Sequence, residues 1–553
     1  MSHGARQEAL MSTTTSYSRP GGFLDYGQAD TARLRVVEEH LLEVFRRYGY
    51  DQVRVPSLEY RDLYHRDRIG EFLYHQLLMA RLSTPALFPI DPPPGYQGEP
   101  EETQAASVHE LVLRPDLTAP VARMFVEGLL RRGPPQRLPY RVSYSAQAFR
   151  DLQADHLRLR EHLQAGVECI GGVRASADLE VLLLACDSMA VVDKERWIMR
   201  LGHAELTHRL LTETGLVGEQ LRAVGRHLER AARIRHISSI GDSDFFERYH
   251  AKVLEILSWV FPEAKESLVP KAGPHEARAA LPTLHEAILR ERLSAMLSTS
   301  QVDKVLAIVS LSSCPKRFFE ELMPLCQSEE SKASAEELQR LTERLIALRD
   351  LPLFLTAAAG RGIAYYTGMT FEVHSPNTGS PYTELGGGGR YDELHRWIYA
   401  RARQTARLRG AEQLPDVDES SLNGVGLAFG LERLASALNY EVAAPIEDLL
   451  VLFEGAAQEL DALRFADRLR ADGLRVVCAA QSEGESGIDA PMTLCFPLVG
   501  LPTLRRGVDA GQRMSIDDAY EQVLGDMARR CGQKDGVLDD MTKRCRQRGG
   551  ADG

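Results

Sequence analysis

Apolar side chains recur at helical spacing in several segments of this chain and alternate with polar side chains in others. Near the N-terminus, Leu34, Val37, Leu41 and Val44 fall on one face of a helix that Gly49 ends. The next stretch, "DQVRVPSLEY", alternates like a β-strand until a proline interrupts it. The pattern therefore predicts that an ordered domain opens with a helix followed by a strand.

The pattern then predicts strands and helices in mixed order. "ELVLRPDLTAPVARMFVEGLL" predicts a short strand, a turn and a helix, and "PYRVSYSAQAFRD" and "LREHLQAGVECIGG" predict two strands joined by a loop. Amphipathic helices such as "HAELTHRLLTETGL" and "SAEELQRLTERLIALRD" follow and indicate a helical insertion. Strand patterns return with "RGIAYYTGMTFEV" and "ELGGGGRYDEL", and "NGVGLAFGLERLASAL" predicts a strand that enters a helix. Beyond residue 445, "EDLLVLFEGAAQELDALRFADRLRADGLRVVCAAQ" predicts a small α/β domain.

These patterns divide the chain into six parts. They are a disordered N-terminus (1–19), the first part of a core domain with a Pro- and Gly-rich surface insertion (20–202, insertion 81–107), a helical insertion lobe (203–349), the second part of the core (350–444), a small α/β domain (445–510) and a helical or disordered tail (511–553).

Composition excludes several classes of protein. The 553 residues include 66 Lys and Arg against 78 Asp and Glu, a net charge of −12, which argues against binding nucleic acid over a broad surface. The eight cysteines are scattered without a CxxC pair, so we expect reduced thiols and no metal site. Neither a signal peptide nor an 18-residue apolar run is present, so the expectation is a cytoplasmic protein with no membrane partner.

Four separated segments place arginines, acids or tyrosines where a predicted strand meets a loop. Any one of them is more simply interpreted as a buried arginine that pairs with a carboxylate to brace a sheet, and "GGGGR" alone indicates only close backbone packing. Because all four segments occur together in one chain and in a particular order, a shared site is the better interpretation. The polar residues are Arg114, Asp116 and Thr118, then Arg150, Arg158, Arg160, Gln164 and Glu168, then Arg361, Tyr365 and Tyr366, and finally Glu432 and Arg433.

In this order the segments resemble the catalytic core of class II aminoacyl-tRNA synthetases, and specifically the histidyl-tRNA synthetase family. "AFRD" with "LREHLQAGVECIG" resembles the second class motif, and "GVGLAFGLERL" resembles the third. "RGIAYYTGMTFEV" and "GGGGRYDEL" resemble the two signatures of the histidine branch. The resemblance implies an α+β fold, with an antiparallel sheet flanked by helices, in a homodimer.

The resemblance also implies how histidine would be held. Asp116 and Thr118 would meet its ammonium group, and Gln164 would contact the same substrate. Glu168, with Tyr365 or Tyr366, would hydrogen-bond the imidazole nitrogens. A site of such polar groups rejects analogues strongly, because a missing partner leaves a buried donor or acceptor unsatisfied.

Arginines would supply the catalytic and ATP-binding groups. By resemblance, Arg361 would face the histidine carboxylate and the α-phosphate, Arg150 the α-phosphate, and Arg433 the γ-phosphate, while Arg158 would also bind ATP. If the chain catalyses adenylate formation, Arg150, Arg361 and Arg433 carry it, with ATP and magnesium. No other cofactor is implied.

Several positions depart from the family pattern. Leu152 stands where synthetases have the glutamate that receives the adenine amino group, and Asp151 is one place early. Ala364 replaces an aspartate before the tyrosines, and Asp116 is the acid of the non-synthetase branch. The C-terminal stretch "SEGESGIDAPMTLCFPL" is acidic where a basic helix would help recognise tRNA, which argues against tRNA as a partner.

Three hypotheses follow. The favoured one is a histidine-binding paralogue that acts as the regulatory subunit of ATP phosphoribosyltransferase in histidine biosynthesis, with a short-form catalytic subunit as its partner. The second is a divergent histidyl-tRNA synthetase that activates histidine with ATP and transfers it to tRNA. The third is a synthetase-like ligase that activates an amino acid for an acceptor other than tRNA.

Overall fold

The computed structural model divides the chain into two compact units, Met1–Tyr26 with Arg33–Glu441 and Gly27–Ala32 with Val442–Gly553. No helix among the described residues is long and apolar enough to cross a membrane. The structure describes residues 19–65, 71–80, 110–133, 138–152, 159–192, 197–225, 286, 289–358, 366–375, 384–408, 415, 417–418, 421–438, 449–472, 474–480, 492–496, 503–506 and 512–531. The predicted insertion at 81–107 lies outside these residues.

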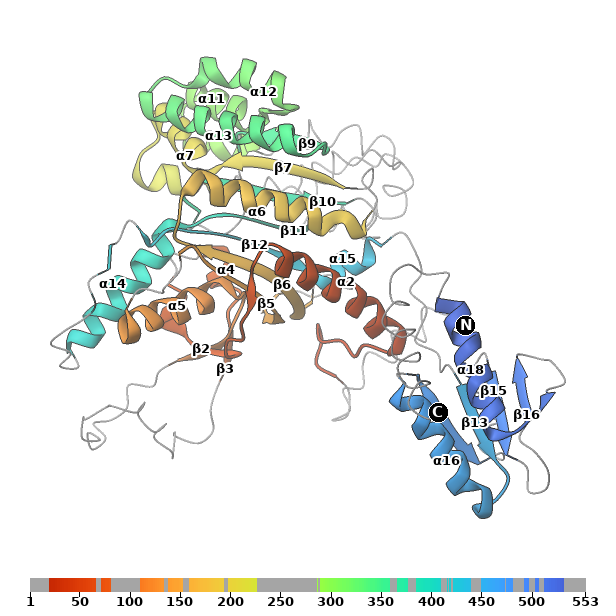
Figure 1. The fold of residues 1–553 in the computed structure, drawn as a ribbon. Helices are drawn as coiled ribbons and strands as arrows, with labels where there is room; N and C mark the ends of the chain where they lie inside the picture. The colour runs from red at the N-terminus through yellow and green to blue at the C-terminus, as the bar shows by residue number, and fades with distance from the viewer. Residues whose placement is uncertain are drawn as a thin grey trace, which may run out of the picture. The chain divides into compact units, whose positions relative to one another are not determined.

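A nine-stranded sheet forms the centre of the first unit, in the order β1-β5-β6-β12-β11-β10-β7-β9-β8 (Figure 1). The pairs from β5 to β7 are antiparallel, whereas β1 pairs with β5 and β7 pairs with β9 in parallel. The strands are β1 (Asp51–Gln52), β5 (Tyr140–Phe149), β6 (Glu161–Ile170), β7 (Ile198–His203), β8 (Ser312–Ser313), β9 (Leu353–Thr356), β10 (Met369–His374), β11 (Glu384–Arg390) and β12 (Gly424–Gly430).

The class II synthetase-like fold is therefore confirmed, with one difference at the edges of the sheet. An antiparallel sheet was predicted, and the pairs from β5 to β7 are antiparallel, while two parallel pairs make the whole sheet mixed. Both parallel pairs join strands that are far apart in the sequence, because parallel neighbours need a long crossover connection. The connection between β7 and β9 carries the helices of the predicted insertion lobe.

Helices cover both faces of this sheet. α2 (Gln28–Arg47) buries the predicted apolar stripe, including Leu34, Val37, Leu41 and Val44. α6 (Arg174–Ser188) contacts β11 and β12 on one face. On the other face Val121 of α5 (Thr118–Arg132), with Leu117 just before the helix, packs against Val142, Tyr144 and Ala148 of β5. α14 (Asp392–Leu408) packs along α5, and α15 (Leu431–Ser436) follows β12.

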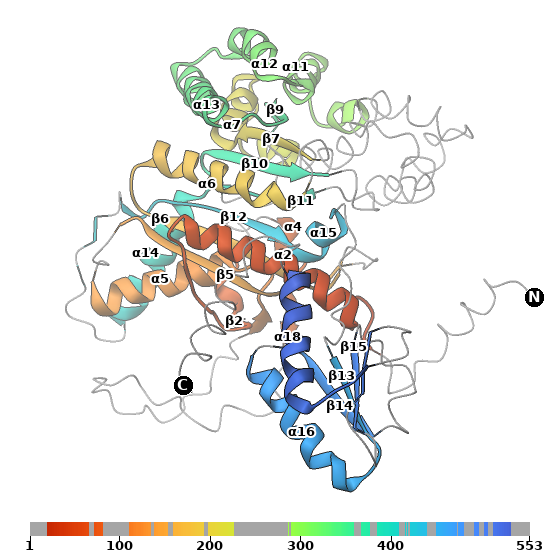
Figure 2. The same ribbon diagram turned by 45° about the vertical axis from the view of Figure 1, so that its right-hand side comes forward.

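Two smaller groups of elements complete the first unit. A three-stranded sheet has the order β2-β4-β3 and lies beside the short elements η1 (Arg61–Leu63) and α4 (Glu71–Tyr74). The insertion lobe contains helices that gather beside β7 and β9 in both views (Figures 1 and 2). The strands are β2 (Leu58–Tyr60), β3 (Leu78–Ala80) and β4 (Leu111–Leu113), and the helices of the lobe are α7 (Ala204–Glu213), α11 (Thr299–Ser310), α12 (Pro315–Leu322) and α13 (Glu329–Leu348), with η5 (Met323–Leu325) as a short turn. The short turn η2 (Met189–Val191) follows α6.

The second unit is a five-stranded sheet in the order β14-β13-β15-β16-β17. α16 (Ala456–Ala471) buries Phe465 and Leu469 in its core, and α18 (Ile516–Cys531) adds Ala519 and Val523. α18 lies in the segment expected to be a helical or disordered tail, and its apolar positions pack against the sheet. The strands are β13 (Leu449–Phe453), β14 (Val476–Ala480), β15 (Met492–Phe496), β16 (Thr503–Arg506) and β17 (Gln512–Arg513).

Candidate functional site

Three neighbouring strands of the central sheet have two paired rows on one face that consist mostly of glycine. Directly paired residues of an antiparallel sheet place their side chains on the same face. Glu168 of β6 pairs with Gly426 of β12, and Gly426 pairs with Gly389 of β11. The next row along these strands consists of Gly166, Ala428 and Gly387. We call Gly166, Gly387, Gly389, Gly426 and Ala428 the glycine floor.

Glu168 stands on this floor and accepts hydrogen bonds from three hydroxyl groups. Its Oε1 accepts from Thr118 Oγ1 at 2.7 Å and from the Tyr144 hydroxyl at 3.1 Å. Its Oε2 accepts from the Tyr391 hydroxyl. Glu168 is only 1% exposed, so these hydroxyls replace the water that would otherwise solvate its carboxylate.

Burial raises the pKa of Glu168 to about 7, although the hydrogen bonds from Tyr391, Thr118 and Tyr144 act in the opposite direction. The nearby carboxyl group of Asp116 raises this pKa further. Glu168 can therefore gain or lose a proton near neutral pH. A ligand that donates a hydrogen bond to the carboxylate would favour its ionised form.

Two positions of the floor must be glycine because side chains lie directly against their backbone. A Cβ atom at Gly426 would overlap the Glu168 carboxylate and would lie 2.6 Å from the carbonyl oxygen of Val167. A Cβ atom at Gly166 would lie 2.6 Å from the Tyr144 hydroxyl oxygen. These glycines allow Glu168 and Tyr144 to approach the sheet closely.

Two buried side-chain oxygens of the predicted site have no hydrogen-bond partner among the described residues. They are Oδ2 of Asp116 and Oε1 of Gln164. Gln164 is four positions before Glu168 on β6, so both side chains are on the same face of the strand. Asp116 is 3% exposed, and burial raises the pKa of its carboxyl group although the charge of Arg150 opposes the change. Oxygens of this kind match a ligand that brings N–H donors.

Arg150 and Arg433 both act on His162, which lies at the other end of β6 from Glu168. Burial lowers the pKa of His162 well below its usual value, and the positive charges of Arg150 and Arg433 lower it further. Arg150 Nε donates to the carbonyl oxygen of Pro115 at 3.0 Å, and Arg433 Nη1 donates to that of Glu384 at 3.0 Å. The two arginines that were predicted to bind phosphate therefore both lower the pKa of the His162 imidazole.

The structure describes only part of the segment that was predicted to form another wall of the site. Arg361, Tyr365, Ala364 and Arg158 lie outside the described residues, so their roles stay predictions. Tyr366 is half-buried, and a Cβ atom on Gly389 would lie 2.8 Å from its Cδ1 atom. Tyr366 thus lies against the glycine floor.

Tyr391 is a site residue that the sequence analysis missed. Tyr365 and Tyr366 were predicted only as further contacts of the imidazole ring, and that role stays a prediction, whereas the hydroxyl that reaches Oε2 of Glu168 belongs to Tyr391. Alternation along β11 contained the signal, because Gly387, Gly389 and Tyr391 share one face when the strand pattern continues to its end.

The backbone around Leu152 is held by an arginine. Arg160 Nε donates to the Leu152 carbonyl oxygen at 3.0 Å, and Arg160 also pairs with Asp151 at 3.5 Å. The Leu152 side chain has no hydrogen-bonding atom. It stands where the family pattern has a glutamate that receives the adenine amino group.

Two other polar residues of the predicted constellation brace the fold. Arg114 donates from Nε to the Gln147 carbonyl oxygen at 2.9 Å and from Nη1 to that of Pro56 at 2.8 Å. Glu432 accepts from the backbone N–H of Leu163 at 2.7 Å and from the Tyr26 hydroxyl at 2.8 Å. Arg114 therefore contacts backbone carbonyl oxygens rather than the carboxylate that the simpler interpretation gave it, and Glu432 ties the N-terminal segment to β6.

A buried ionic network that the sequence analysis did not predict surrounds the base of Tyr391. Arg390 is completely buried and donates from Nε to Asp178 and from Nη1 to Asp392, each at 2.8 Å. Asp392 Oδ1 also accepts from the backbone N–H of Gly424 at 3.1 Å. The network joins α6, β11 and β12 next to the site.

The comparisons with known proteins agree with this architecture. A family model described as histidyl-tRNA synthetase matches residues 103–288 and 263–406, which together span more than half of the 553 residues. The chain belongs to the histidyl-tRNA synthetase family. Curated relatives of the chain carry two different names.

Curated relatives with each name have the same percentage identity to this chain. The ATP phosphoribosyltransferase regulatory subunit of Nostoc punctiforme is 26% identical over 459 residues, which cover 82% of this chain and 88% of the relative. The histidine–tRNA ligase of Geobacillus kaustophilus is 26% identical over 469 residues, which cover 83% and 84%. Overall identity therefore does not separate the two activities, and the decision rests on the site.

Solved structures share the fold. A structure from Bacillus halodurans titled ATP phosphoribosyltransferase regulatory subunit/histidyl-tRNA synthetase aligns with a TM-score of 0.58 at 21% identity, over 88% of this chain and all of the other. A histidyl-tRNA synthetase from a Nostoc species aligns with a TM-score of 0.59 at 15% identity, over 92% of this chain and 99% of the other. At these identities the likeness establishes only the class II fold.

Proposed function

We propose that this member of the family binds histidine on the glycine floor and acts as a regulatory subunit of ATP phosphoribosyltransferase. The observation that carries the proposal is the group of buried acceptors formed by Asp116 Oδ2, Gln164 Oε1 and the Glu168 carboxylate. Free histidine has an ammonium group with three N–H donors and an imidazole ring with at least one. It therefore supplies donors for each of these acceptors.

The geometry supports one orientation of the ligand. Asp116 and Gln164 receive the ammonium group, because both have buried oxygens without a partner among the described residues. Glu168 receives an imidazole N–H, because its carboxylate already lies among Thr118, Tyr144 and Tyr391 on a floor without side chains. Arg150, close to Asp116, lies where it can meet the carboxylate of the amino acid.

A regulatory role is favoured over catalysis by the adenine side of the site. Leu152 offers its apolar side chain where the family pattern has an acceptor for the adenine amino group, and its carbonyl oxygen is engaged by Arg160. Histidine would regulate a partner only if it bound one state of the complex better than another. The partner in this proposal is a short-form catalytic subunit, and the regulatory chain itself is a cytoplasmic homodimer.

Calorimetric titration with histidine tests the binding site. The Asp116→Asn variant should lose at least tenfold in affinity, because the buried acceptor for the ammonium group loses its charge. Asp151→Asn is the control, since Asp151 is exposed and pairs only at the surface with Arg160. Equal affinity in wild type and Asp116→Asn would contradict this assignment of the acceptor group.

A reconstituted complex tests the regulatory role. A short-form phosphoribosyltransferase subunit should copurify with the chain, gain activity on mixing and become inhibited by histidine. The mixture with Asp116→Asn should keep its activity and require at least tenfold more histidine for inhibition. Activity that does not change on mixing would contradict the regulatory assignment while leaving histidine binding intact.

The second candidate, a divergent synthetase, is favoured by Arg150 and Arg433, which both act on His162 at one end of the site. Two guanidinium groups there could hold the phosphates of ATP. Among the described residues no cluster of His, Cys, Asp or Glu is suited to hold a metal ion, so magnesium would depend on the phosphates. Histidine-dependent exchange of pyrophosphate into ATP would support this candidate, and exchange without charging of tRNA would support a ligase for another acceptor.

A further inference from the structure

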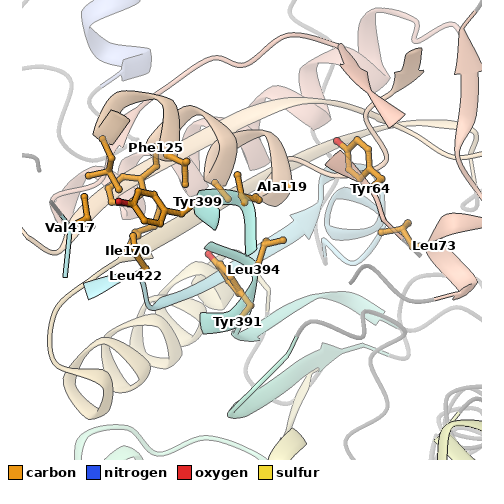
Figure 3. Packing of buried hydrophobic residues seen from close by; sticks show 14 of the residues in the cluster. Tyr64, Leu73, Ala119, Phe125, Ile170, Tyr391, Leu394, Tyr399, Val417 and Leu422 are labelled. Atoms are coloured by element: carbon orange, nitrogen blue, oxygen red, sulfur yellow. The ribbon is translucent and has the colours of Figure 1, made fainter. Parts of the chain in front are cut away.

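His395 lies behind Tyr391 in the first turns of α14 and is completely buried. The two rings are stacked, with centroids 5.4 Å apart and planes 25° apart. Phe125 meets His395 edge-on, with a centroid distance of 6.0 Å and an interplanar angle of 88°. Figure 3 shows Tyr391 with Leu394, Phe125 and Tyr399 in the surrounding hydrophobic cluster. The stack fixes the plane of the Tyr391 ring.

Gly424 makes the stack possible. A Cβ atom at this position would lie 2.5 Å from Cε1 of His395 and 2.8 Å from Cε2 of Tyr391. Both rings therefore rest on bare backbone at the start of β12. The bare backbone at Gly424 therefore lets the Tyr391 ring adopt the orientation in which its hydroxyl group donates to Oε2 of Glu168.

The two ring nitrogens of His395 do not explain why a histidine stands at this position. Both ring nitrogens are buried and have no hydrogen-bond partner among the described residues. Burial lowers the pKa of His395 to about 4, so the ring is neutral at physiological pH. Buried nitrogens without partners destabilise a fold relative to apolar atoms of the same shape. The contacts of His395 are instead those of a small flat ring between Tyr391, Phe125 and Gly424.

We propose that His395 is a positioning residue that holds the Tyr391 hydroxyl on Glu168 and so sharpens discrimination between imidazole ligands. The first half of this proposal concerns the empty protein. The second half rests on the proposed binding of histidine. Hydrogen-bonding groups that are held in one geometry reject a ligand with a missing donor more strongly than mobile groups do.

Infrared titration of the empty protein tests the positioning role. The protonated Glu168 carboxyl group gives a C=O band that is absent from Glu168→Gln, and its midpoint reports the pKa of Glu168. The Tyr391 hydrogen bond lowers this pKa. His395→Leu and Tyr391→Phe should therefore each raise the midpoint by about half to one pH unit, and the flat ring of His395→Phe should keep it at the wild-type value.

A core substitution separates positioning from stability. Ile398 is buried in the same cluster, one turn along α14 from His395. Ile398→Ala should lower the melting temperature while leaving the midpoint at its wild-type value. A midpoint in His395→Leu equal to that of Ile398→Ala would overturn the proposal. If His395→Leu does not fold, His395→Met replaces the flat ring with a flexible side chain and takes the same measurement.

Binding of methylated histidines tests discrimination. The ratio of the dissociation constants for 1-methylhistidine and histidine should fall about tenfold in His395→Leu and stay unchanged in Ile398→Ala. An unchanged ratio in His395→Leu would overturn the role in discrimination. If wild type binds no histidine, the proposed function fails, whereas the infrared midpoints still decide whether His395 positions Tyr391.

Discussion

The Tyr391 hydroxyl donates a hydrogen bond to Oε2 of Glu168, although the two residues are 223 positions apart in the sequence. Tyr391 follows the last residue of β11, and Glu168 lies near the end of β6. β12 separates these strands and contributes only Gly426 beneath the contact. The site therefore depends on side chains that meet across a strand whose own side chain is absent.

Gly426 is expected to be intolerant of any side chain. In Gly426→Ala the new Cβ atom would overlap the Glu168 carboxylate, so Glu168 must move. We expect a loss of roughly 1–3 kcal/mol in the free energy of unfolding. Histidine affinity should fall at least tenfold in calorimetric titration, because the acceptor of the imidazole N–H is displaced.

Gly430→Ala is the matched control on the same strand. A Cβ atom there would meet nothing closer than Cδ of Arg433 at 3.8 Å, which is an ordinary van der Waals contact. Its stability should remain within about 0.5 kcal/mol of wild type. Similar losses in the two variants would show that β12 is generally sensitive and that the Glu168 contact is not the cause.

Glu168 should make the stability of the empty protein fall as the pH rises. Its pKa is raised from 4.5 to about 7 in the folded protein, so the folded state holds a proton that the unfolded state releases. The stabilising contribution is full below pH 4.5 and is lost as the pH rises through 7. Denaturant titrations give the free energy of unfolding at pH 5 and at pH 8. The difference between these two values should be smaller in Glu168→Gln than in wild type, by on the order of 2 kcal/mol. An identical pH dependence in both proteins would contradict this assignment.

Histidine binding should weaken as the pH falls below 7. Protonation of Glu168 removes the charge that favours the imidazole N–H, and the ligand ring becomes cationic in the same range. Between pH 8 and pH 6, we expect affinity to fall about tenfold in calorimetric titrations. Asp116→Asn should bind more weakly and show this fall at a lower pH, because Asp116 no longer raises the pKa of Glu168, whereas Glu168→Gln should reduce the fall itself. Affinity that rises toward pH 6 would argue against Glu168 as the imidazole acceptor.

Arg390 should be a large contributor to stability. Arg390→Met would leave the buried carboxylates of Asp178 and Asp392 without their guanidinium partner. Breaking a buried pair in this way destabilises a protein by about 3–5 kcal/mol. Arg317→Met removes a pair with Glu321 at the surface and should change stability by less than about 1 kcal/mol. Chemical denaturation measures both, and equal effects would contradict the role of the network.

The local elements were predictable because each follows from a short pattern. The helix with Leu34, Val37 and Leu41 on its buried face is α2, and the break at Pro56 separates β1 from β2. Asp116, Gln164 and Glu168 were found because their motifs resemble a known family. The two parallel strand pairs were not predicted, because the alternation of polar and apolar residues within a strand does not show which strand pairs with it.

Residues that act through distant neighbours were harder to predict. In the sequence, Arg390 is simply the last residue of a glycine-rich strand. Its buried ion pair with Asp178 of α6 is seen only in the folded structure. His395 reads as one more position of an amphipathic helix, and its ring becomes significant only because Tyr391 and Gly424 enclose it. Neither contact has a local signature, because the partners lie on separate elements.

By itself, the sequence determined the helices and strands, the class II fold and the kinds of side chain that could meet histidine. These depend on spacing within short segments and on recognisable motifs. Only the tertiary structure decided that Tyr391 completes the environment of Glu168, that Gly426 makes room for it and that Glu168 titrates near neutral pH. Burial and hydrogen bonding create these properties, and both arise only when strands far apart in the chain become neighbours.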